Sequence, residues 1–292
     1  MADAERGSGA PTAARPVNER PPVPGWRPAD WQAPPGVRAG VTTREGGVGS
    51  GAHATFNLAA YVGDAAAAVA ANRARLAAAL ALPAAPRWLR QMHGVGVAVQ
   101  RRLEAPGAFG SAATGQLPDS GEPPEADAAV TFEPGVVLAV LSADCLPVVL
   151  AHRTGDRVGI AHAGWRGLAA GVIERTVAAL AAPAAELSAW LGPAIGSAAF
   201  EVGAEVRAAF VAGDPGAAAG FVANARGRWQ ADLYLLARRR LERLGVDRVE
   251  GGGACTYTNT AQFFSYRRDP ACGRMATLVW IEPVEFARPG PT

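Results

Sequence analysis

Lysine is absent from this chain of 292 residues, because every one of its 28 basic residues is an arginine. The absence excludes a lysine Schiff base, a Walker-type lysine for phosphate and a Ser-Lys catalytic dyad. Any anionic ligand must therefore be held by arginine side chains or by backbone N–H groups. Arginine suits phosphate, because its planar guanidinium can donate two parallel hydrogen bonds.

Cysteine and charge are also scarce. The three cysteines show no C-x-x-C spacing, and an odd number does not make a disulfide framework. Because the first 25 residues contain no apolar run that could serve as a secretion signal, we expect a cytoplasmic protein. The longest apolar stretch, residues 128–151, is interrupted by charged residues and a proline, so no membrane span is expected. A net charge of +2 argues against nucleic acid or an acidic membrane as a partner.

The pattern of apolar residues predicts one mixed α/β (α+β) domain at residues 31–285, between an N-terminal tail at residues 1–30 and a C-terminal tail at residues 286–292. Segments rich in alanine, leucine and arginine predict helices at residues 65–82, 167–182, 201–212 and 231–245. Apolar runs predict strands at the start of residues 36–64 and at residues 95–100, 127–132, 136–142, 146–152 and 157–163. A strand followed by a turn is predicted at residues 187–196, and the segments 246–257, 262–269 and 275–286 predict strands around a glycine-rich stretch. Residues 105–126 are rich in glycine and proline and predict a long loop.

Reactive side chains stand at the ends of the predicted strands. Asp144 and Cys145 separate two apolar runs, and His162 ends the next one, directly before the turn Ala-Gly-Trp-Arg-Gly. A lone cysteine in such a run is usually a small buried residue, but a buried carboxylate beside it is costly without a partner. Together with His93, in the segment Gln-Met-His-Gly, these residues indicate a functional site rather than a core.

Two interpretations of this site are compatible with the residues alone. His93, Cys145 and His162 can be three ligands of a zinc ion, with a fourth position left for water or substrate. The same residues can be a cysteine nucleophile, Cys145, that is activated by His162. Neither arrangement has a local spacing signature that separates the two.

The chain resembles the laccase-domain family, also described as YfiH-like or multicopper polyphenol oxidoreductase-like proteins, over residues 36–282. The most specific matching segments are "AHAGWRG" and "SADCLPVVL". Further segments in the same order are "TREGGVGSG", "FNLAAYVGD", "QMHG", "ADAAVT", "LGPAIG", "FEVG", "DLYLLARRRLERLGV", "CTYT", "FFSYRRD" and "GR". The resemblance implies a single-domain, four-layer α/β/β/α sandwich with mixed sheets. By motif it implies that His93, Cys145 and His162 are the ligands of Zn²⁺.

Copper oxidase chemistry does not follow from this resemblance. The chain has four histidines, whereas a blue-copper site together with a multinuclear copper cluster needs many more imidazole ligands. Cu²⁺ can replace Zn²⁺ in the same three-ligand site on affinity alone, and such copper would be adventitious.

Members of the family are described as purine nucleoside phosphorylases, so the resemblance implies purine nucleosides and phosphate as ligands. The implied reactions are phosphorolysis of adenosine, inosine and methylthioadenosine to the free base and ribose 1-phosphate, with adenosine deaminase as a side activity. Catalysis would use Cys145, His162 and Asp144, the last to support the metal site or to handle a proton. The sequence leaves open whether the chain is a monomer or a homodimer.

Residues that could bind the substrate come from the same motifs. The candidates for phosphate, each beside a glycine or a turn, are Arg44, Arg166 and Arg267. The aromatic candidates for the base are Phe264, Tyr266 and Trp165. Two further candidates for the pocket, chosen by motif membership, are Asn57 and Cys255.

Two other functions remain as alternatives. A cysteine-type hydrolase or amidase that acts in cell-wall peptidoglycan editing would use Cys145 as a thiolate in metal-free protein. A regulatory or metal-binding module would act through a partner that supplies the activity.

Overall fold

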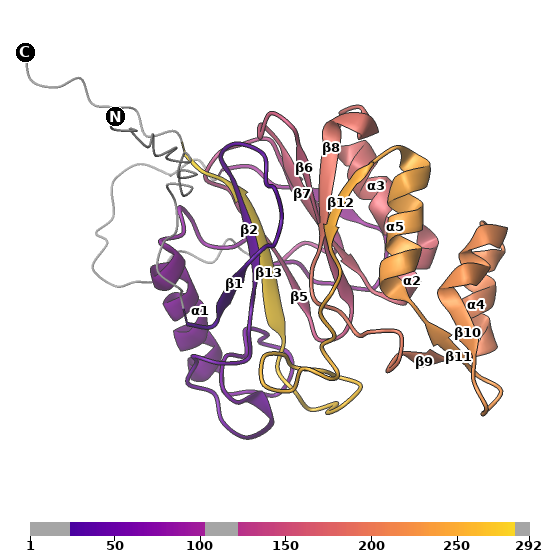
Figure 1. Cartoon of the computed structure of the whole chain (residues 1–292). Coiled ribbons are helices and arrows are strands. Elements are labelled where there is room, and N and C mark those ends of the chain that lie inside the picture. Colours follow the sequence, from indigo (N-terminus) through magenta and orange to yellow (C-terminus); the bar gives the residue numbers. More distant parts are fainter. Residues whose placement is uncertain (1–23, 103–121, 284–292) are drawn as a thin grey trace, which may run out of the picture.

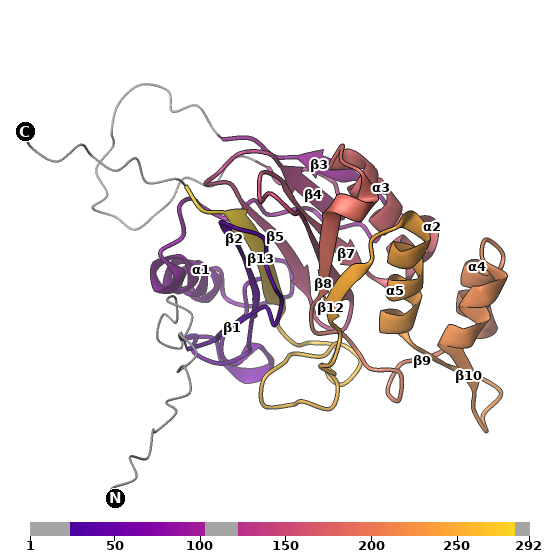
Figure 2. The same cartoon turned by 45° about the horizontal axis from the view of Figure 1, so that its top comes forward.

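Two β-sheets packed face to face form the middle of the computed structural model, which describes residues 24–102 and 122–283. A helix covers the outer face of the first sheet, and a group of helices covers the outer face of the second (Figures 1 and 2). The predicted single-domain α/β/β/α sandwich is therefore confirmed.

The first sheet consists of antiparallel strands in the order β1 (Trp26–Pro28), β2 (Val37–Thr42), β13 (Met275–Ile281) and β5 (Val137–Ser142). Its outer face is covered by α1 (Ala66–Leu80). Side chains alternate along β5: Leu141 packs with the residues of α1, whereas Leu138 and Val140 face the second sheet. Because both faces are buried, this strand reads in the sequence as a continuous apolar run.

The second sheet is mixed, with the strand order β12 (Arg248–Gly251), β8 (Leu187–Leu191), β6 (Leu146–His152), β7 (Val158–Ala163), β4 (Ala128–Thr131) and β3 (Val97–Val99). The two outer pairs, β12 with β8 and β3 with β4, are parallel, and the inner pairs are antiparallel. On β6, Val148 and Leu150 face the helices, whereas Val149 and Ala151 face the first sheet.

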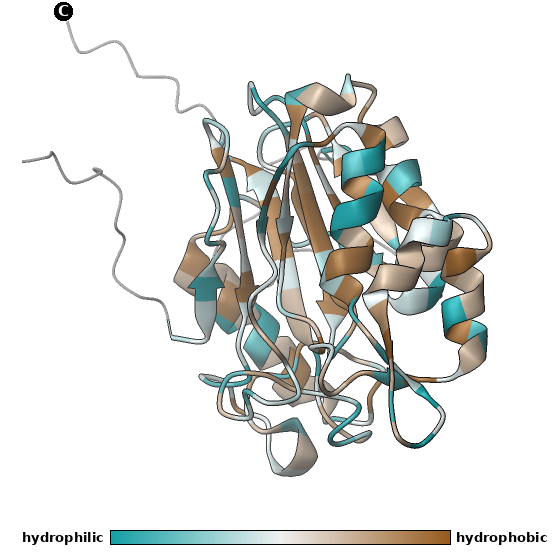
Figure 3. Ribbon diagram, turned by 45° about the vertical axis from the view of Figure 1, so that its right-hand side comes forward, coloured by the Kyte–Doolittle hydropathy of each residue, from teal (hydrophilic) through white to brown (hydrophobic). Residues whose placement is uncertain are grey.

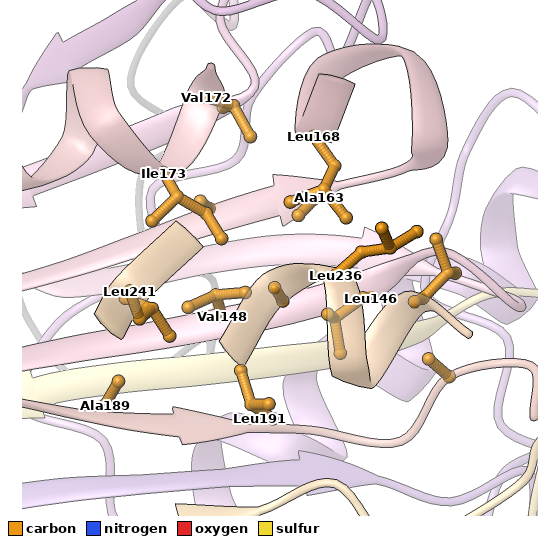
Figure 4. Close-up of a cluster of buried hydrophobic side chains, with 14 of the residues drawn as sticks. Leu146, Val148, Ala163, Leu168, Val172, Ile173, Ala189, Leu191, Leu236 and Leu241 are labelled. Atoms are coloured by element: carbon orange, nitrogen blue, oxygen red, sulfur yellow. The ribbon is translucent and has the colours of Figure 1, made fainter. Parts of the chain in front are cut away.

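The helical layer over the second sheet contains α2 (Trp165–Ala170), α3 (Val172–Ala179) and α5 (Leu233–Leu244). Leu168, Ile173 and Leu241 from these helices pack onto Leu146 and Val148 of β6 (Figure 4). The edge of the molecule beyond α5 holds α4 (Ala204–Val211) and a small antiparallel sheet of β10 (Phe221–Ala223), β11 (Trp229–Ala231) and β9 (Glu201–Val202). Figure 3 shows hydrophobic strands in the interior and hydrophilic patches on the helices.

The predicted helix at residues 167–182 differs from the structure in both start and continuity. It begins at Trp165 and is divided into α2 and α3 at Gly171, which has a φ of 100°. Glycine reaches this left-handed region without the steric penalty that a Cβ imposes, so the chain can turn here. The predicted helix at residues 65–82 is confirmed as α1.

The predicted strand at residues 262–269 is wrong, because this segment forms turns. Its backbone is held by a side chain instead of a neighbouring strand. The guanidinium of Arg268 donates hydrogen bonds to the carbonyl oxygens of Thr256 (2.8 Å), Tyr257 (2.7 Å) and Phe263 (2.7 Å). A periodic apolar pattern gives no sign of such a contact.

Arg268→Met should therefore destabilise the protein without removing any residue of the candidate site described below. Three carbonyl groups lose a charged donor, and we expect a loss of about 2 kcal/mol in the free energy of unfolding. For a chain of this size, that loss lowers the melting temperature by about 4–8 °C. Differential scanning calorimetry measures the shift, and an unchanged melting temperature would show that Arg268 does not hold this loop.

The fold begins inside the predicted N-terminal tail. β1 pairs with β2, and Trp190 Nε1 donates a hydrogen bond of 2.6 Å to Asp30 Oδ1. Residues 1–23, most of the predicted loop at residues 105–126 and the predicted C-terminal tail lie outside the described residues. In the described ranges, no helix has the length and apolar character needed to cross a bilayer.

Candidate metal centre

Cys145 and His162 come together because the strands beside them are neighbours. β6 and β7 are antiparallel, with Pro147 paired with His162, so Cys145 lies at the same edge of the sheet. Side chains alternate along a strand, and Val149 and Ile160 of these strands face the first sheet. Cys145 and His162 therefore share the face that is turned toward the space between the two sheets.

His93 completes the group from the loop before β3. The ligand atoms of His93, Cys145 and His162 all lie within 4.8 Å of one another, and His93 Nε2 is 3.9 Å from Cys145 Sγ. Tetrahedral zinc, with bonds of about 2.3 Å to sulfur and 2.0 Å to nitrogen, places such atoms about 3.6 Å apart. The His93–Cys145 distance is within a few tenths of an ångström of that spacing, and the widest pair must close by up to about 1 Å before all three atoms can bind one ion. His93 is exposed and Cys145 is partly exposed, so the group is open to solvent on one side.

Asp127, which directly precedes β4, holds two of the three ligands in place. Its carboxylate accepts a hydrogen bond of 2.8 Å from His162 Nδ1, which leaves Nε2 of that ring for a metal. The same carboxylate accepts from the backbone N–H groups of Met92 (3.0 Å), His93 (2.9 Å) and Gly94 (2.6 Å). His93 has a φ of 60°, in the left-handed region that few residues other than glycine adopt, and these bonds hold it there.

The pKa of Asp127 reflects these contacts. Burial alone raises the pKa of a carboxyl group, but the hydrogen bonds from His162 and from backbone N–H groups outweigh burial and lower it. Asp127 is therefore an ionised carboxylate behind the imidazole of His162. A carboxylate in this position orients a metal-ligating histidine and makes it a stronger donor.

Two glycines allow the start of α2 to approach the group closely. A Cβ at Gly164 would lie 2.9 Å from Cys145 Sγ and 3.1 Å from His93 Cδ2. A Cβ at Gly167 would lie 2.7 Å from the carbonyl oxygen of Gly94. The glycines of the His-Ala-Gly-Trp-Arg-Gly segment are thus required by packing against the other two ligand segments.

Burial and neighbouring charges shift the pKa values of Cys145 and His162 in opposite directions. Burial raises the pKa of the Cys145 thiol, but His162 and His93 outweigh it and lower that pKa to about 6. Burial lowers the pKa of His162, while Cys145 and Asp127 raise it to about 9. Near neutral pH, the metal-free pair is a thiolate beside an imidazolium, and a metal must displace the proton on His162.

Alkylation of Cys145 in metal-free protein should follow this lowered pKa. The thiolate is the nucleophile, so the rate with iodoacetamide should be high above about pH 6 and fall below it. His162→Asn should move the midpoint up toward the ordinary thiol value of about 8.5. Mass spectrometry of the Cys145 peptide measures the rate; a wild-type midpoint near 8.5 would contradict the thiolate–imidazolium pair.

Asp144, predicted as a catalytic or metal-supporting residue, points elsewhere. Its carboxylate accepts hydrogen bonds from Thr256 Oγ1 (2.6 Å) and from the backbone N–H of Arg267 (2.7 Å). These bonds tie the chain beside Cys145 to the loops at residues 256–267. The carboxylate behind His162 is that of Asp127, and a role for Asp144 in catalysis or at a metal stays a prediction.

Two predicted pocket residues need correction. Asn57 and Phe264 are both 0% exposed, so neither side chain lines a pocket. The carboxamide of Asn57 is used within the protein, where it bonds Ala59, Asp64 and the backbone N–H of Arg274. Phe264 belongs to the core between the two sheets.

The predicted phosphate residues fall into different settings. The guanidinium of Arg44 donates to the carbonyl oxygens of Ala54 and Thr260, so it acts as a tie between two loops. Arg166 is exposed, and its guanidinium carbon lies 4.4 Å from the ring centre of Trp165. Arg267 is also exposed and donates to the carbonyl oxygen of Glu201. A phosphate role for any of the three stays a prediction.

Of the two remaining predicted residues, Tyr266 is 53% exposed and lies beside the guanidinium of Arg274. Cys255 is partly exposed, and its sulfur accepts a hydrogen bond from the backbone N–H of Gly196. Asp127 is the residue that sequence reasoning missed. It stands in the "ADAAVT" segment, where a carboxylate opening a fully buried strand is itself a signal of a buried polar contact.

Fold and site together define the class of this protein: a four-layer α/β/β/α sandwich with a solvent-accessible His-Cys-His group at the strand ends of its mixed sheet. A family model described as multi-copper polyphenol oxidoreductase laccase matches residues 38–282. The chain therefore belongs to this laccase-like family.

Relatives of known name are similar over nearly their whole length. The chain is 49% identical to a purine nucleoside phosphorylase of Pseudomonas aeruginosa over 258 residues, covering 88% of this chain and 98% of the relative. It is 46% identical to the purine nucleoside phosphorylase YfiH of Escherichia coli over 254 residues, covering 86% and 96%. A solved structure from Neisseria meningitidis matches with a TM-score of 0.79 at 44% identity, covering 89% of this chain and 100% of that one. YlmD from Geobacillus stearothermophilus matches with a TM-score of 0.79 at 29% identity, covering 90% and 98%.

The copper in the family description is not matched by the ligands of this chain. Of the four histidines, His53 contacts the carbonyl oxygen of Val62, and His152 contacts Glu186 and Thr154. The remaining two belong to the group with Cys145. A multinuclear copper cluster therefore lacks its imidazole ligands here.

Proposed function

We propose that the protein is a zinc-dependent purine nucleoside phosphorylase. It cleaves adenosine, inosine and methylthioadenosine to the free base and ribose 1-phosphate, and it has adenosine deaminase as a second activity. The observation that carries the proposal is the convergence of His93, Cys145 and His162 on one accessible point, with Asp127 behind them. Relatives named purine nucleoside phosphorylase support the reaction, and one thiolate with two imidazoles is a donor set typical of zinc.

Zinc bound by these residues would supply a Lewis acid with one open coordination position. The protein's own groups supply the geometry. Asp127 keeps Nε2 of His162 turned toward Cys145, and its bonds to the backbone at residues 92–94 fix the approach of His93. In phosphorolysis, an oxygen of phosphate bonds to C1′ of the ribose, the bond from C1′ to the purine nitrogen breaks, and the base leaves with a proton.

We expect phosphorolysis to be the main activity and deamination the minor one. Zinc deaminases pair the metal with a carboxylate that transfers protons. The two carboxylates beside the ligands, Asp127 and Asp144, both accept hydrogen bonds from several protein groups. Deamination is therefore expected to be the slower activity.

Product analysis of zinc-loaded protein with adenosine tests the proposal. We expect adenine and ribose 1-phosphate only when phosphate is present, and a smaller amount of inosine with or without it. Inosine as the main product in both conditions would make deamination the principal reaction. Absence of all three products from protein that carries one equivalent of zinc would contradict the proposal.

A cysteine-type hydrolase or amidase in cell-wall editing is the second candidate, and the thiolate–imidazolium pair of the metal-free site favours it. This candidate requires activity on peptidoglycan peptides in metal-free protein, with loss of that activity on alkylation of Cys145. Activity that appears only with zinc would exclude it.

A further inference from the structure

Tyr61 is unusually exposed for a large aromatic residue. It is 65% exposed, and its hydroxyl makes no hydrogen bond with any described residue. It stands inside the "FNLAAYVGD" segment. Exposed aromatic residues in an otherwise ordered loop are common at binding sites, because the ring and the hydroxyl are available for a ligand.

The loop that carries Tyr61 is fastened to Arg274. The backbone N–H of Leu58 donates to the carbonyl oxygen of Arg274 (3.3 Å), and the backbone N–H of Arg274 donates to Asn57 Oδ1 (2.9 Å). The side chain of Asn57 also donates to Asp64 Oδ2 (3.0 Å), which closes the loop from its other end. Tyr61 is thus presented beside Arg274 by bonds on both sides of it.

A series of contacts connects Arg274 with the metal ligands. The guanidinium carbon of Arg274 is 5.4 Å from the ring centre of Tyr266, and the next residue, Arg267, donates its backbone N–H to Asp144, the neighbour of Cys145. The phenol of Tyr61 interacts electrostatically with both Arg274 and Cys145. Arg73 adds a second positive charge near the same phenol.

One edge of the Arg274 guanidinium is available. Nη1 donates to the carbonyl oxygens of Cys272 (2.6 Å) and Gly273 (3.1 Å), which fixes the plane of the group. Nε and Nη2 make no hydrogen bond within residues 24–102 and 122–283. These two nitrogens form the side of a guanidinium that can donate two parallel hydrogen bonds to an oxyanion. Arg44, by contrast, uses Nε and Nη2 on the carbonyl oxygen of Ala54.

We propose that Arg274 and Tyr61 form the subsite that binds a phosphate-like oxyanion beside the metal centre. This inference rests on the proposed function, because phosphate is the second substrate of a phosphorylase. Arg274 donates two hydrogen bonds through Nε and Nη2, the hydroxyl of Tyr61 donates a third, and Arg73 adds positive potential. An anion held there would be available to attack C1′ of a ribose bound beside His93, Cys145 and His162.

Inorganic phosphate is the probe that tests this subsite, by isothermal titration calorimetry on zinc-loaded protein. Arg274→Met should weaken phosphate binding by about tenfold or more, Arg274→Lys by less, and Tyr61→Phe by about threefold. Arg248→Met is the matched control, since Arg248 is an exposed arginine on β12, and should leave phosphate binding unchanged. The zinc content and melting temperature of each variant are measured together with the affinity.

Kinetics give a second readout. Arg274→Met should raise the KM for phosphate about tenfold while the KM for adenosine changes by less than about twofold. An unchanged phosphate affinity in Arg274→Met and Tyr61→Phe, with phosphorolysis intact in the wild type, overturns the subsite and leaves the proposed function standing. If phosphate affinity is lost in Arg267→Met but kept in Arg274→Met and Tyr61→Phe, the anion binds at Arg267 and the proposed subsite is wrong. If the wild type neither binds phosphate nor depends on it, both the subsite and the proposed function fail.

Discussion

Cys145→Ala is expected to abolish stoichiometric zinc binding and to lower phosphate-dependent cleavage of adenosine on the order of 10³-fold. The thiolate is the negatively charged ligand of the group, and two imidazoles alone hold zinc weakly. Losing the Lewis acid removes several kcal/mol of stabilisation from the transition state, which corresponds to this factor in rate. Elemental analysis of the purified variant and the rate of adenine release measure the two effects.

Cys255→Ala serves as the control for metal binding, since Cys255 is partly exposed and contacts Gly196 rather than the ligand group. It should retain one equivalent of zinc. Full activity in Cys145→Ala without bound metal would mean that the chemistry does not take place at the His-Cys-His group. Retained zinc in Cys145→Ala would mean that the ion is held elsewhere.

Asp127→Asn should weaken zinc binding by about 10–100-fold, the usual effect of losing the carboxylate behind a metal-ligating histidine. An asparagine keeps the size of the side chain, but its uncharged oxygen is a weaker acceptor for His162 Nδ1, which now bonds Asp127 at 2.8 Å. Competition with a chromogenic zinc chelator gives the affinity. Asp144→Asn is the matched comparison and should leave zinc affinity unchanged, because Asp144 bonds Thr256 and Arg267.

The reverse pattern, with zinc affinity lost in Asp144→Asn and kept in Asp127→Asn, would contradict the geometry of the site. It would also restore the role that the sequence alone suggested for Asp144. If both variants kept the zinc affinity of the wild type, neither carboxylate would support the ligands.

Most strands were predictable because their patterns have a direct physical cause. β5 and β6 are buried on both faces, and such strands read as continuous apolar runs. The strand predicted at residues 262–269 was wrong because aromatic residues are typical of strands, whereas the backbone of this segment is held by Arg268 from within the loop. The division of the helix at Gly171 could not be predicted, because one glycine in a helical pattern does not reveal a left-handed φ.

For the site, the reactive residues could be found from the sequence but their partners could not. The three ligands stand in short motifs, and the structure brings them within 4.8 Å. Which carboxylate faces His162 depends on the pairing of β4 with β7, a long-range contact that motifs do not encode. The same limit applies to Asn57 and Phe264, whose motifs are real but whose side chains are buried.

Stepwise return of zinc to metal-stripped wild-type protein tests the central claim most directly, with phosphate-dependent release of adenine from adenosine followed at each addition. A catalytic metal at His93, Cys145 and His162 predicts no activity in stripped protein and a linear rise that stops at one equivalent. Full activity before any zinc is added would contradict it.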